Sequence, residues 1–282
     1  FCNRKTADLT QPKQVEQLFL DNKPDYVIHA AAQCGGVIGN KKFQAEYYYN
    51  NILMNTNVIH FASKHNVKKL LAFSSTCVFP PNLHTFTEED MHMGEPFGIH
   101  FAYAYTKRMI DVQIRASARQ YNTNYCSIIS SNIFGNHDNY HLEDSHVIPS
   151  LIHKCYLAKK YNKNLEIWGD GSPKREFIFS LDSARIVMSL LDLEQDLPRK
   201  ILVGSDDELS IKEVALKIKS IFNFHGDLVF NKQKPNGQIR KKSDLTLLKS
   251  LLPDFKYTNI DESLSSSIKW FEKNYPNIRG VA

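Results

Sequence analysis

The sequence predicts an α/β fold built around a parallel sheet. Three short apolar segments, residues 26–31, 70–75 and 125–130, read as buried strands, and helical patterns separate them. This alternation favours parallel pairing, because parallel neighbours need a helical crossover between them. The chain has 282 residues, 42% of them hydrophobic, and contains no internal repeat or low-complexity linker. That length suffices for one large domain or two small ones.

The helical segments follow from periodicity and from end signals. We expect a helix of about 20 residues between the first strand and a turn at residues 64–66. Residues 101–120, rich in Ala, Arg, Tyr and Met, form a second helix. Ser210 and Glu213 make an S-x-x-E capping box that opens a helix to about Phe222. The last helix is amphipathic, with apolar positions Leu264, Ile268, Trp270 and Phe271.

The pattern becomes more mixed beyond Pro149, with short strand-like segments at residues 165–168, 201–203 and 228–230. We therefore expect a boundary near residue 148. Residues 1–148 would form a nucleotide-binding domain of Rossmann type, and residues 149–282 mainly a smaller α/β substrate domain.

Composition narrows the class of partner. The net charge of +5 is spread along the chain, and its densest basic run is Arg240-Lys241-Lys242. A solvated loop is the first interpretation of that run, a small anionic ligand the second and nucleic acid the last. No Cys/His spacing is typical of a metal site. No apolar run approaches the roughly 20 residues of a membrane span, so we expect neither metal, nucleic acid nor membrane as partner.

The cysteines indicate a compartment. There are five of them, an odd number without close pairs. In a chain of this length they are typical of reduced thiols in a cytoplasmic protein. No signal peptide is visible in residues 1–10, and the chain begins with Phe1, so we also expect that it has been trimmed.

One spacing carries chemistry. Tyr103 and Lys107 are four residues apart, so they lie one turn apart on the same face of a helix. A neighbouring ammonium lowers the pKa of a phenol by stabilising the phenolate. The spacing alone is also typical of an ordinary helix surface. The context strengthens the chemical reading, because Ser75 ends a buried strand at the edge where open α/β sheets bind ligands.

Ser75, Tyr103 and Lys107 resemble the triad of the extended short-chain dehydrogenase/reductase family. Further segments narrow the resemblance to the branch that epimerises and reduces GDP-4-keto-6-deoxy-D-mannose to GDP-L-fucose, and it extends over nearly the whole chain. The matching segments are HAAAQCGGVIGN, SSTCVFP, YAYTKRMIDVQ, SNIFGNHDNYHLEDSHVIP, IWGDGSPKREFIFSLD and FNKQKPNGQIRK.

The resemblance implies catalytic roles. NADPH would be the hydride donor, Tyr103 would protonate the C4 oxygen, Lys107 would lower the pKa of that tyrosine, and Ser75 would position the carbonyl. Cys77 and His146 would act as base and acid at C3 and C5, with their assignment left open. Outside the matched motifs, such a cysteine is more often a core residue and such a histidine a surface or capping residue.

The resemblance also implies binding residues. Asp8 and Leu9 would contact the adenine of NADP(H), although Asp8 could equally cap a helix. Asn236 stands where the family usually has an acid. The other cofactor contacts would be Ala30, Ala31, Ala32, Tyr103, Lys107 and His146. The GDP-sugar contacts would be Asn132, Lys154, Trp168, Arg175 and Lys234. Two helices, the one after Asn40 and residues 101–120, would form a homodimer.

No G-x-G-x-x-G phosphate loop occurs in the chain, and the family carries its own before the position of Asp8. We expect a trimmed form of an active enzyme, since every downstream catalytic position is present. A degenerate, non-catalytic homologue that binds GDP-sugars is the alternative. A different sugar-nucleotide epimerase or dehydratase ranks lower, because such dehydratases usually have acids where this chain has Thr76 and Cys77.

Overall fold

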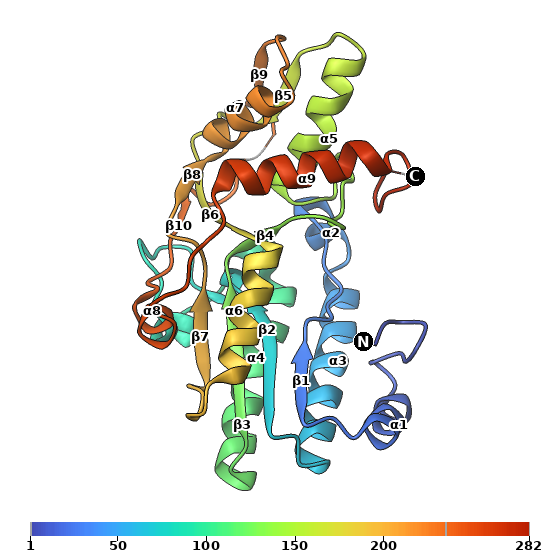
Figure 1. Cartoon of the computed structure of the whole chain (residues 1–282), viewed down its shortest axis with the longest axis vertical. Helices are drawn as coiled ribbons and strands as arrows, with labels where there is room; N and C mark the ends of the chain where they lie inside the picture. The colour runs from blue at the N-terminus through green and yellow to red at the C-terminus, as the bar shows by residue number, and fades with distance from the viewer. Residues whose placement is uncertain (1, 235, 282) are drawn as a thin grey trace.

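A computed structural model of the chain describes residues 2–234 and 236–281 (Figure 1). The strands are β1 (Tyr26–His29), β2 (Lys69–Ser75), β3 (Asn124–Ser130), β4 (Asn132–Phe134), β5 (Leu165–Trp168), β6 (Lys174–Phe179), β7 (Lys200–Val203), β8 (Glu208–Ser210), β9 (Leu228–Asn231) and β10 (Arg240–Lys241). The α-helices are α1 (Pro12–Asn22), α2 (Val37–Lys42), α3 (Gln44–Lys64), α4 (Phe101–Tyr121), α5 (Val147–Lys160), α6 (Ser180–Asp192), α7 (Ile211–Ile221), α8 (Thr246–Leu251) and α9 (Ile260–Asn274).

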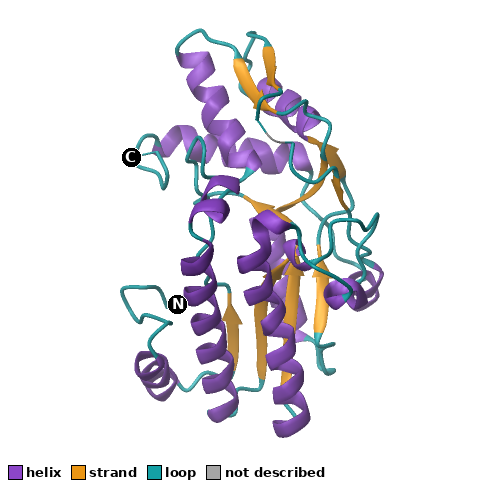
Figure 2. Cartoon of the chain, turned by 180° about the vertical axis from the view of Figure 1, so that it is seen from behind, coloured by secondary structure: helices purple, strands orange, loops and turns teal. Residues whose placement is uncertain are grey.

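The lower half of the molecule is a three-layer sandwich around a parallel sheet of order β1-β2-β3-β7. Helices α3 and α4 cover one face, which Figure 2 shows in front, and α6 covers the other. The alternation along β2 explains both layers. Leu70 and Ala72 belong to the core under α3 and α4, whereas Leu71 belongs to the core under α6. The predicted fold class, α/β with a parallel sheet, is therefore confirmed.

The upper half holds the smaller strands and a second core. Strands β4, β6 and β10 pair in parallel, β8 runs antiparallel to β6, and β5 pairs with β9. Helices α5, α7 and α9 pack around these strands. The capping box at the start of α7 is present: Ser210 Oγ accepts from the Glu213 amide at 3.1 Å, and the Glu213 carboxylate accepts from the Ser210 amide at 2.7 Å.

Three features differ from the sequence expectation. The predicted helix of about 20 residues is present as α3, which ends at Lys64, but a short helix that the sequence did not predict, α2, precedes it. Helix α6 and strand β7 follow residue 148, yet both pack on the first sheet. Asp8 caps no helix. Its carboxylate accepts from the backbone and side chain of Thr10 at 3.0 and 2.8 Å, in a local turn before α1.

Two further structural facts bear on partners. No helix in the described part of the chain is both long and apolar enough to cross a membrane. Among residues 2–234 and 236–281, no three His, Cys, Asp or Glu side chains gather in a group that could hold a metal ion.

The buried carboxyl group of Glu176 ties β6 to the segment that follows β10. Its side chain is 2% exposed, and its Oε1 accepts from the Ser243 amide at 3.0 Å. Burial raises the pKa of Glu176 to about 7, against the opposing effect of the bonds from Ser243. The folded state therefore binds this proton at pH values where the unfolded chain has released it.

We predict that Glu176 lowers the stability of the fold as the pH rises from about 4.5 to 7. Because the pKa of Glu176 is higher in the folded state, the stabilisation from this group is complete below pH 4.5, the pKa of the unfolded chain, and is lost as the pH rises to about 7. Urea denaturation at pH 5 and pH 8 checks this. The free energy of unfolding should fall from pH 5 to pH 8 by about 1–3 kcal/mol more in the wild type than in Glu176→Gln. The exposed control Glu262→Gln should leave this fall unchanged; an unchanged fall in Glu176→Gln would contradict the prediction.

Candidate active site

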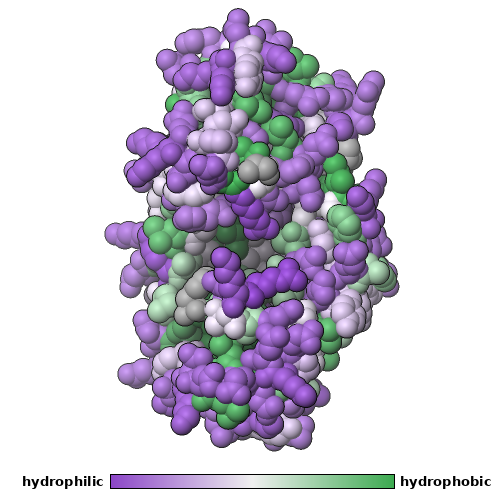
Figure 3. Space-filling model, turned by 90° about the vertical axis from the view of Figure 1, so that its right-hand side faces the viewer, coloured by the Kyte–Doolittle hydropathy of each residue, from purple (hydrophilic) through white to green (hydrophobic). Residues whose placement is uncertain are grey.

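A cavity of about 730 Å³ lies where the carboxyl ends of the parallel strands meet the upper half of the molecule. Its walls come from the segment after β1, the end of β2, the start of α4, and from β4, α5, β6 and β10. The face drawn in Figure 3 is hollowed between the two halves, with apolar residues at the bottom of the hollow. The lining includes all five predicted catalytic residues: Ser75, Cys77, Tyr103, Lys107 and His146.

Helix α4 presents the tyrosine and the lysine. The Lys107 ammonium donates to the carbonyl of Phe73 at 2.8 Å and lies 5.7 Å from the centre of the Tyr103 ring. Burial lowers the pKa of Lys107 to about 8. Burial also raises the pKa of Tyr103 well above its ordinary value, and the neighbouring thiols Cys34 and Cys77 add to this rise. Without ligands, the phenol therefore keeps its proton at neutral pH and is poised as a donor.

Strand β2 delivers the serine and the cysteine. It ends at Ser75, and the chain turns through one 3₁₀ turn, η1 (Thr76–Val78). Ser75 Oγ accepts from the Cys77 amide at 3.4 Å, which closes this turn. The Cys77 side chain is 7% exposed. Burial raises the pKa of its thiol, while Lys241 and the bond with Ser75 act in the opposite direction. Two reactive groups thus leave one strand end within a single short turn.

The glycine pair of residues 35 and 36 fixes the segment that carries the histidine. Asp144 Oδ1 accepts from the amides of Gly36 and Gly39 at 2.8 and 3.0 Å. A Cβ atom on Gly36 would lie 2.9 Å from the carbonyl of Ser145. Only glycine allows that approach without a shift. His146 follows directly as the N-cap residue of α5, exposed toward the cavity. The glycine loop therefore binds its own chain and positions His146.

Several predicted substrate residues meet around one indole ring. The ammonium groups of Lys154 and Lys234 lie 4.6 and 4.7 Å from the centre of the Trp168 ring. Arg175 on β6 donates to the carbonyl of Gln238 at 2.6 Å, and burial lowers its pKa to about 10. The cavity lining includes Asn132, Lys154, Trp168 and Arg175. Cationic and aromatic groups thus form the part of the site that suits a nucleoside diphosphate.

Some predicted residues lie outside the lining of this cavity. Ala30 and Ala32 line it, whereas Ala31 does not. Lys234 touches Trp168 from beyond the lining. Asp8 and Leu9 lie in the loop before α1, where the Leu9 carbonyl accepts from Asn57 at 2.9 Å. The predicted adenine contacts of Asp8 and Leu9 therefore stay predictions.

The structure adds three residues that the sequence did not single out. Cys34 lies beside Tyr103, and His100 and Lys241 line the same cavity. Burial lowers the pKa of His100 to about 4 and that of Lys241 to about 8. The position of Lys241 in the cavity lining favours the second interpretation of the basic run, a small anionic ligand. The strand register explains the position of Lys241: β10 pairs it with Arg175 of β6, beside the site.

The residues at the strand ends fit a nicotinamide nucleotide. Ala30 and Ala32 leave the backbone after β1 approachable, and the Lys107 ammonium donates only one of its three protons to the protein bonds described. The hydroxyl groups of Ser130 and Ser131 are buried without a partner among the described residues. Free donors and small side chains at this edge are the groups that ribose and amide oxygens require.

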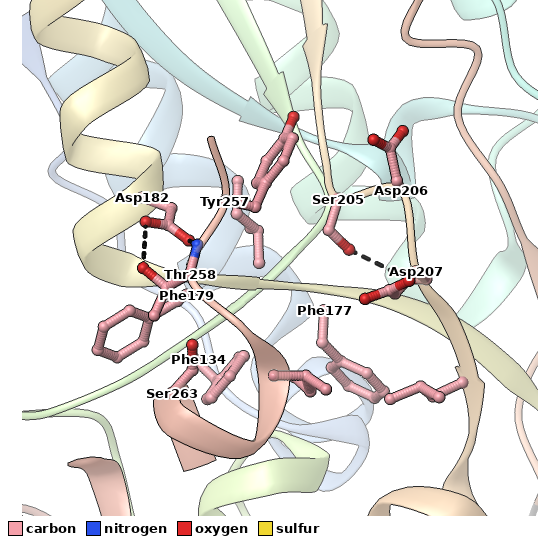
Figure 4. Close-up of a pocket in the computed structure, with 13 residues that line it drawn as sticks. Phe134, Phe177, Phe179, Asp182, Ser205, Asp206, Asp207, Tyr257, Thr258 and Ser263 are labelled. Carbon is pink, nitrogen blue, oxygen red and sulfur yellow. Dashed lines mark hydrogen bonds between the residues drawn. The ribbon is translucent and has the colours of Figure 1, made fainter. Parts of the chain in front are cut away.

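A second, smaller cavity of about 210 Å³ lies between the start of α6 and the segment before α9 (Figure 4). Asp182 accepts from the backbone and side chain of Thr258, both at 2.8 Å, and Ser205 Oγ donates to the carbonyl of Asp207. Its aromatic wall is made by Phe134, Phe177 and Phe179. Asp182 and Ser205 thus bond to groups of the same chain, and the cavity lies at the junction between the two halves.

Known proteins resemble this chain over most of its length. The model of the NAD dependent epimerase/dehydratase family matches residues 2–204. The GDP-L-fucose synthase of Dictyostelium discoideum is 42% identical over 281 residues, which cover 99% of this chain and 88% of the relative. The GDP-L-fucose synthase of Escherichia coli is 30% identical over 287 residues, covering 98% of this chain and 89% of the relative.

Solved structures of related proteins are similar to this chain as well. The GDP-L-fucose synthetase of Naegleria fowleri bound to NADP superposes with a TM-score of 0.92 at 36% identity, covering 99% of this chain and 86% of that chain. A reductase of GDP-6-OMe-4-keto-L-xylo-heptose from C. jejuni gives a TM-score of 0.86 at 26% identity, covering 97% and 89%. The chain belongs to the NAD dependent epimerase/dehydratase family, among relatives named GDP-L-fucose synthase.

Proposed function

We propose that this chain converts GDP-4-keto-6-deoxy-D-mannose to GDP-L-fucose, by epimerisation at C3 and C5 and NADPH-dependent reduction at C4. The observation that carries the proposal is the meeting of five groups, Ser75, Cys77, Tyr103, Lys107 and His146, in one cavity. The names of its relatives, and the NADP bound to one of the similar structures, support it.

The reduction uses the groups of α4 and the end of β2. NADPH supplies the hydride for C4. The phenol of Tyr103 donates its proton to the C4 oxygen, so that carbonyl becomes alcohol and tyrosine becomes tyrosinate. The Lys107 ammonium, which keeps its charge below about pH 8, stabilises that phenolate. Ser75, at the end of β2, holds the carbonyl oxygen by a hydrogen bond.

The epimerisation uses the two groups that approach from different elements. A keto group at C4 acidifies the protons on C3 and C5, because the resulting carbanion is delocalised as an enediolate. Cys77 comes from the turn after β2 and His146 from the start of α5. A base on one side of the sugar and an acid on the other invert a centre by removing a proton from one face and returning one to the opposite face. Either residue can serve as base.

The GDP portion would occupy the cationic end of the cavity. Arg175 suits the diphosphate through its planar fork of donors, and Trp168 offers a face for stacking. Lys154 and Lys234 add positive charge on the indole ring, and Asn132 offers an amide at the start of β4. Lys241, also in the lining, adds one further cation.

We also propose that the two parts of the chain bind different ligands. Residues 1–148 would hold NADP(H), with Asp8 and Leu9 at the adenine, and residues 149–282 would mainly hold the GDP-sugar. The enzyme would work in the cytoplasm as a homodimer. The cysteines, all five free, support that compartment. The dimer is supported by α3 and α4, which lie side by side over one face of the sheet with exposed apolar side chains such as Tyr49 and Val112.

We predict that the full-length protein oxidises NADPH only when GDP-4-keto-6-deoxy-D-mannose is supplied and that Tyr103→Phe reduces its kcat by about 10²-fold or more, because the proton donor is lost. Absorbance at 340 nm measures the rate. The control is Tyr161→Phe, an exposed tyrosine outside the cavity, which should retain wild-type kcat. No NADPH consumption by the full-length wild-type protein with this substrate would refute the enzyme. Binding of GDP-L-fucose without binding of NADPH, measured by calorimetry, would instead identify a non-catalytic GDP-sugar-binding protein.

We predict a solution mass of twice 32.4 kDa for the wild-type chain by light scattering. Val112→Glu should shift the population to the monomer, because a carboxylate would be buried between the paired helices. Tyr161→Glu, an equally drastic change on an exposed residue outside these helices, should stay dimeric. A wild-type mass of 32.4 kDa across micromolar concentrations would overturn the homodimer.

A further inference from the structure

A buried arginine directly follows the lysine of the candidate site. Arg108 is 3% exposed and lies on α4. Its Nε and Nη2 donate to the carbonyl of Val78 at 2.8 and 2.5 Å, and Nη2 also donates to the carbonyl of Gly94 at 2.6 Å. None of the reaction steps above uses this side chain. Its guanidinium nevertheless holds the last residue of the turn that contains Cys77.

Lys107 and Arg108 hold that turn from its two sides. Lys107 donates to the carbonyl of Phe73, two residues before Ser75. Arg108 donates to the carbonyl of Val78, one residue after Cys77. The short segment that carries the serine and the thiol is thus fixed at both ends by consecutive side chains of one helix. The same helix carries Tyr103, so these bonds set Cys77 relative to the proton donor for C4.

The charge on Arg108 is unusual for a purely structural contact. In the described part of the chain, no salt bridge involves Arg108. A buried cation without a salt bridge is costly, and a neutral donor would suffice for a carbonyl. Its guanidinium carbon lies 5.2 Å from the centre of the Tyr105 ring. Burial lowers the pKa of Arg108, while the charges of Tyr105, Glu95 and Cys77 counteract this.

A second tether holds the same loop independently. Asp111, one turn beyond Lys107, is fully buried and accepts from His92 Nε2 at 2.8 Å and from Arg115 Nε at 2.9 Å. His92 ends the 3₁₀ segment η2 (Glu88–His92) of the loop between Val78 and α4. Removing Arg108 would therefore loosen the turn at Cys77 and leave the rest of the loop attached to α4.

We propose that Arg108 is the positioning residue for Cys77, holding its turn against α4 so that the thiol reaches the carbons next to the carbonyl that Tyr103 protonates. The proposal rests on the proposed function for the role of Cys77. Arg108 lies outside the lining of the cavity, so it acts through the turn and not on the substrate.

The test is a double-mutant cycle on epimerisation. Incorporation of solvent deuterium at C3 and C5 of the GDP-sugar is followed by mass spectrometry in Arg108→Met, Arg108→Lys, Cys77→Ser and Cys77→Ser/Arg108→Met. Arg108→Met should slow exchange about tenfold or more with the KM for the GDP-sugar within about twofold, and Arg108→Lys should recover part of the rate. In the Cys77→Ser background, Arg108→Met should have no further effect. The matched control is Arg119→Met, an exposed arginine on the same helix, with wild-type exchange.

Equal exchange in wild type and Arg108→Met would overturn the proposal, as would a full additive effect in the Cys77→Ser background. A wild-type chain that exchanges no deuterium would refute the proposed function instead. Arg108 is then tested without turnover, by the alkylation rate of Cys77 with iodoacetamide, read from the peptide that contains this residue. The positioning role is supported if the alkylation rate of Arg108→Met differs from that of the wild type by about fivefold or more while that of Arg119→Met is unchanged. Equal rates in Arg108→Met and wild type reject it.

Discussion

The structure depends on two buried cations of one helix that bind the carbonyls on either side of a strand end. Lys107 holds Phe73 and Arg108 holds Val78. These bonds tie helix α4 to the edge of the sheet where ligands bind, and they convert a helix, a strand and a turn into one rigid unit. The bond from Arg108 to Val78 is buried and the bond from Lys107 to Phe73 is partly buried, and in such surroundings a hydrogen bond is stronger and its loss is more costly. The serine, thiol and phenol of the site all belong to this unit.

The second half of the site is brought to this unit by small residues and a carboxylate. The Asp144 side chain binds the amides of Gly36 and Gly39, and this contact sets the segment that ends at His146. The glycine loop after β1 thus fixes the position of a distant segment of the same chain. The site then has two sides that different elements supply, as inversion at carbon requires, since the proton leaves from one face and returns to the other.

The sequence was sufficient for the strands and most helices, because burial and periodicity are local signals. The apolar run at residues 70–75 predicted β2, and the Ser210 and Glu213 pair predicted the start of α7; both are confirmed. The short helix α2 was not predicted, because six residues are too few to show a helical period. The sequence did not predict that the chain returns to the first sheet, where β7 pairs with β3. Strand order depends on pairing between distant segments, which short-range patterns do not encode.

For the candidate site, matched motifs found the residues that chemistry makes recognisable, and their roles stay predictions. They assigned no role to Lys241, which belongs to a basic run typical of a solvated loop. It lines the cavity because β10 pairs it with Arg175. The central claim is that this cavity presents the C4 oxygen of a GDP-sugar to Tyr103. A crystal structure with GDP-L-fucose and NADP tests it most directly. We predict that oxygen within about 3 Å of the Tyr103 hydroxyl and the diphosphate beside Arg175. A sugar bound elsewhere, with Tyr103 and Cys77 free of it, would contradict the account.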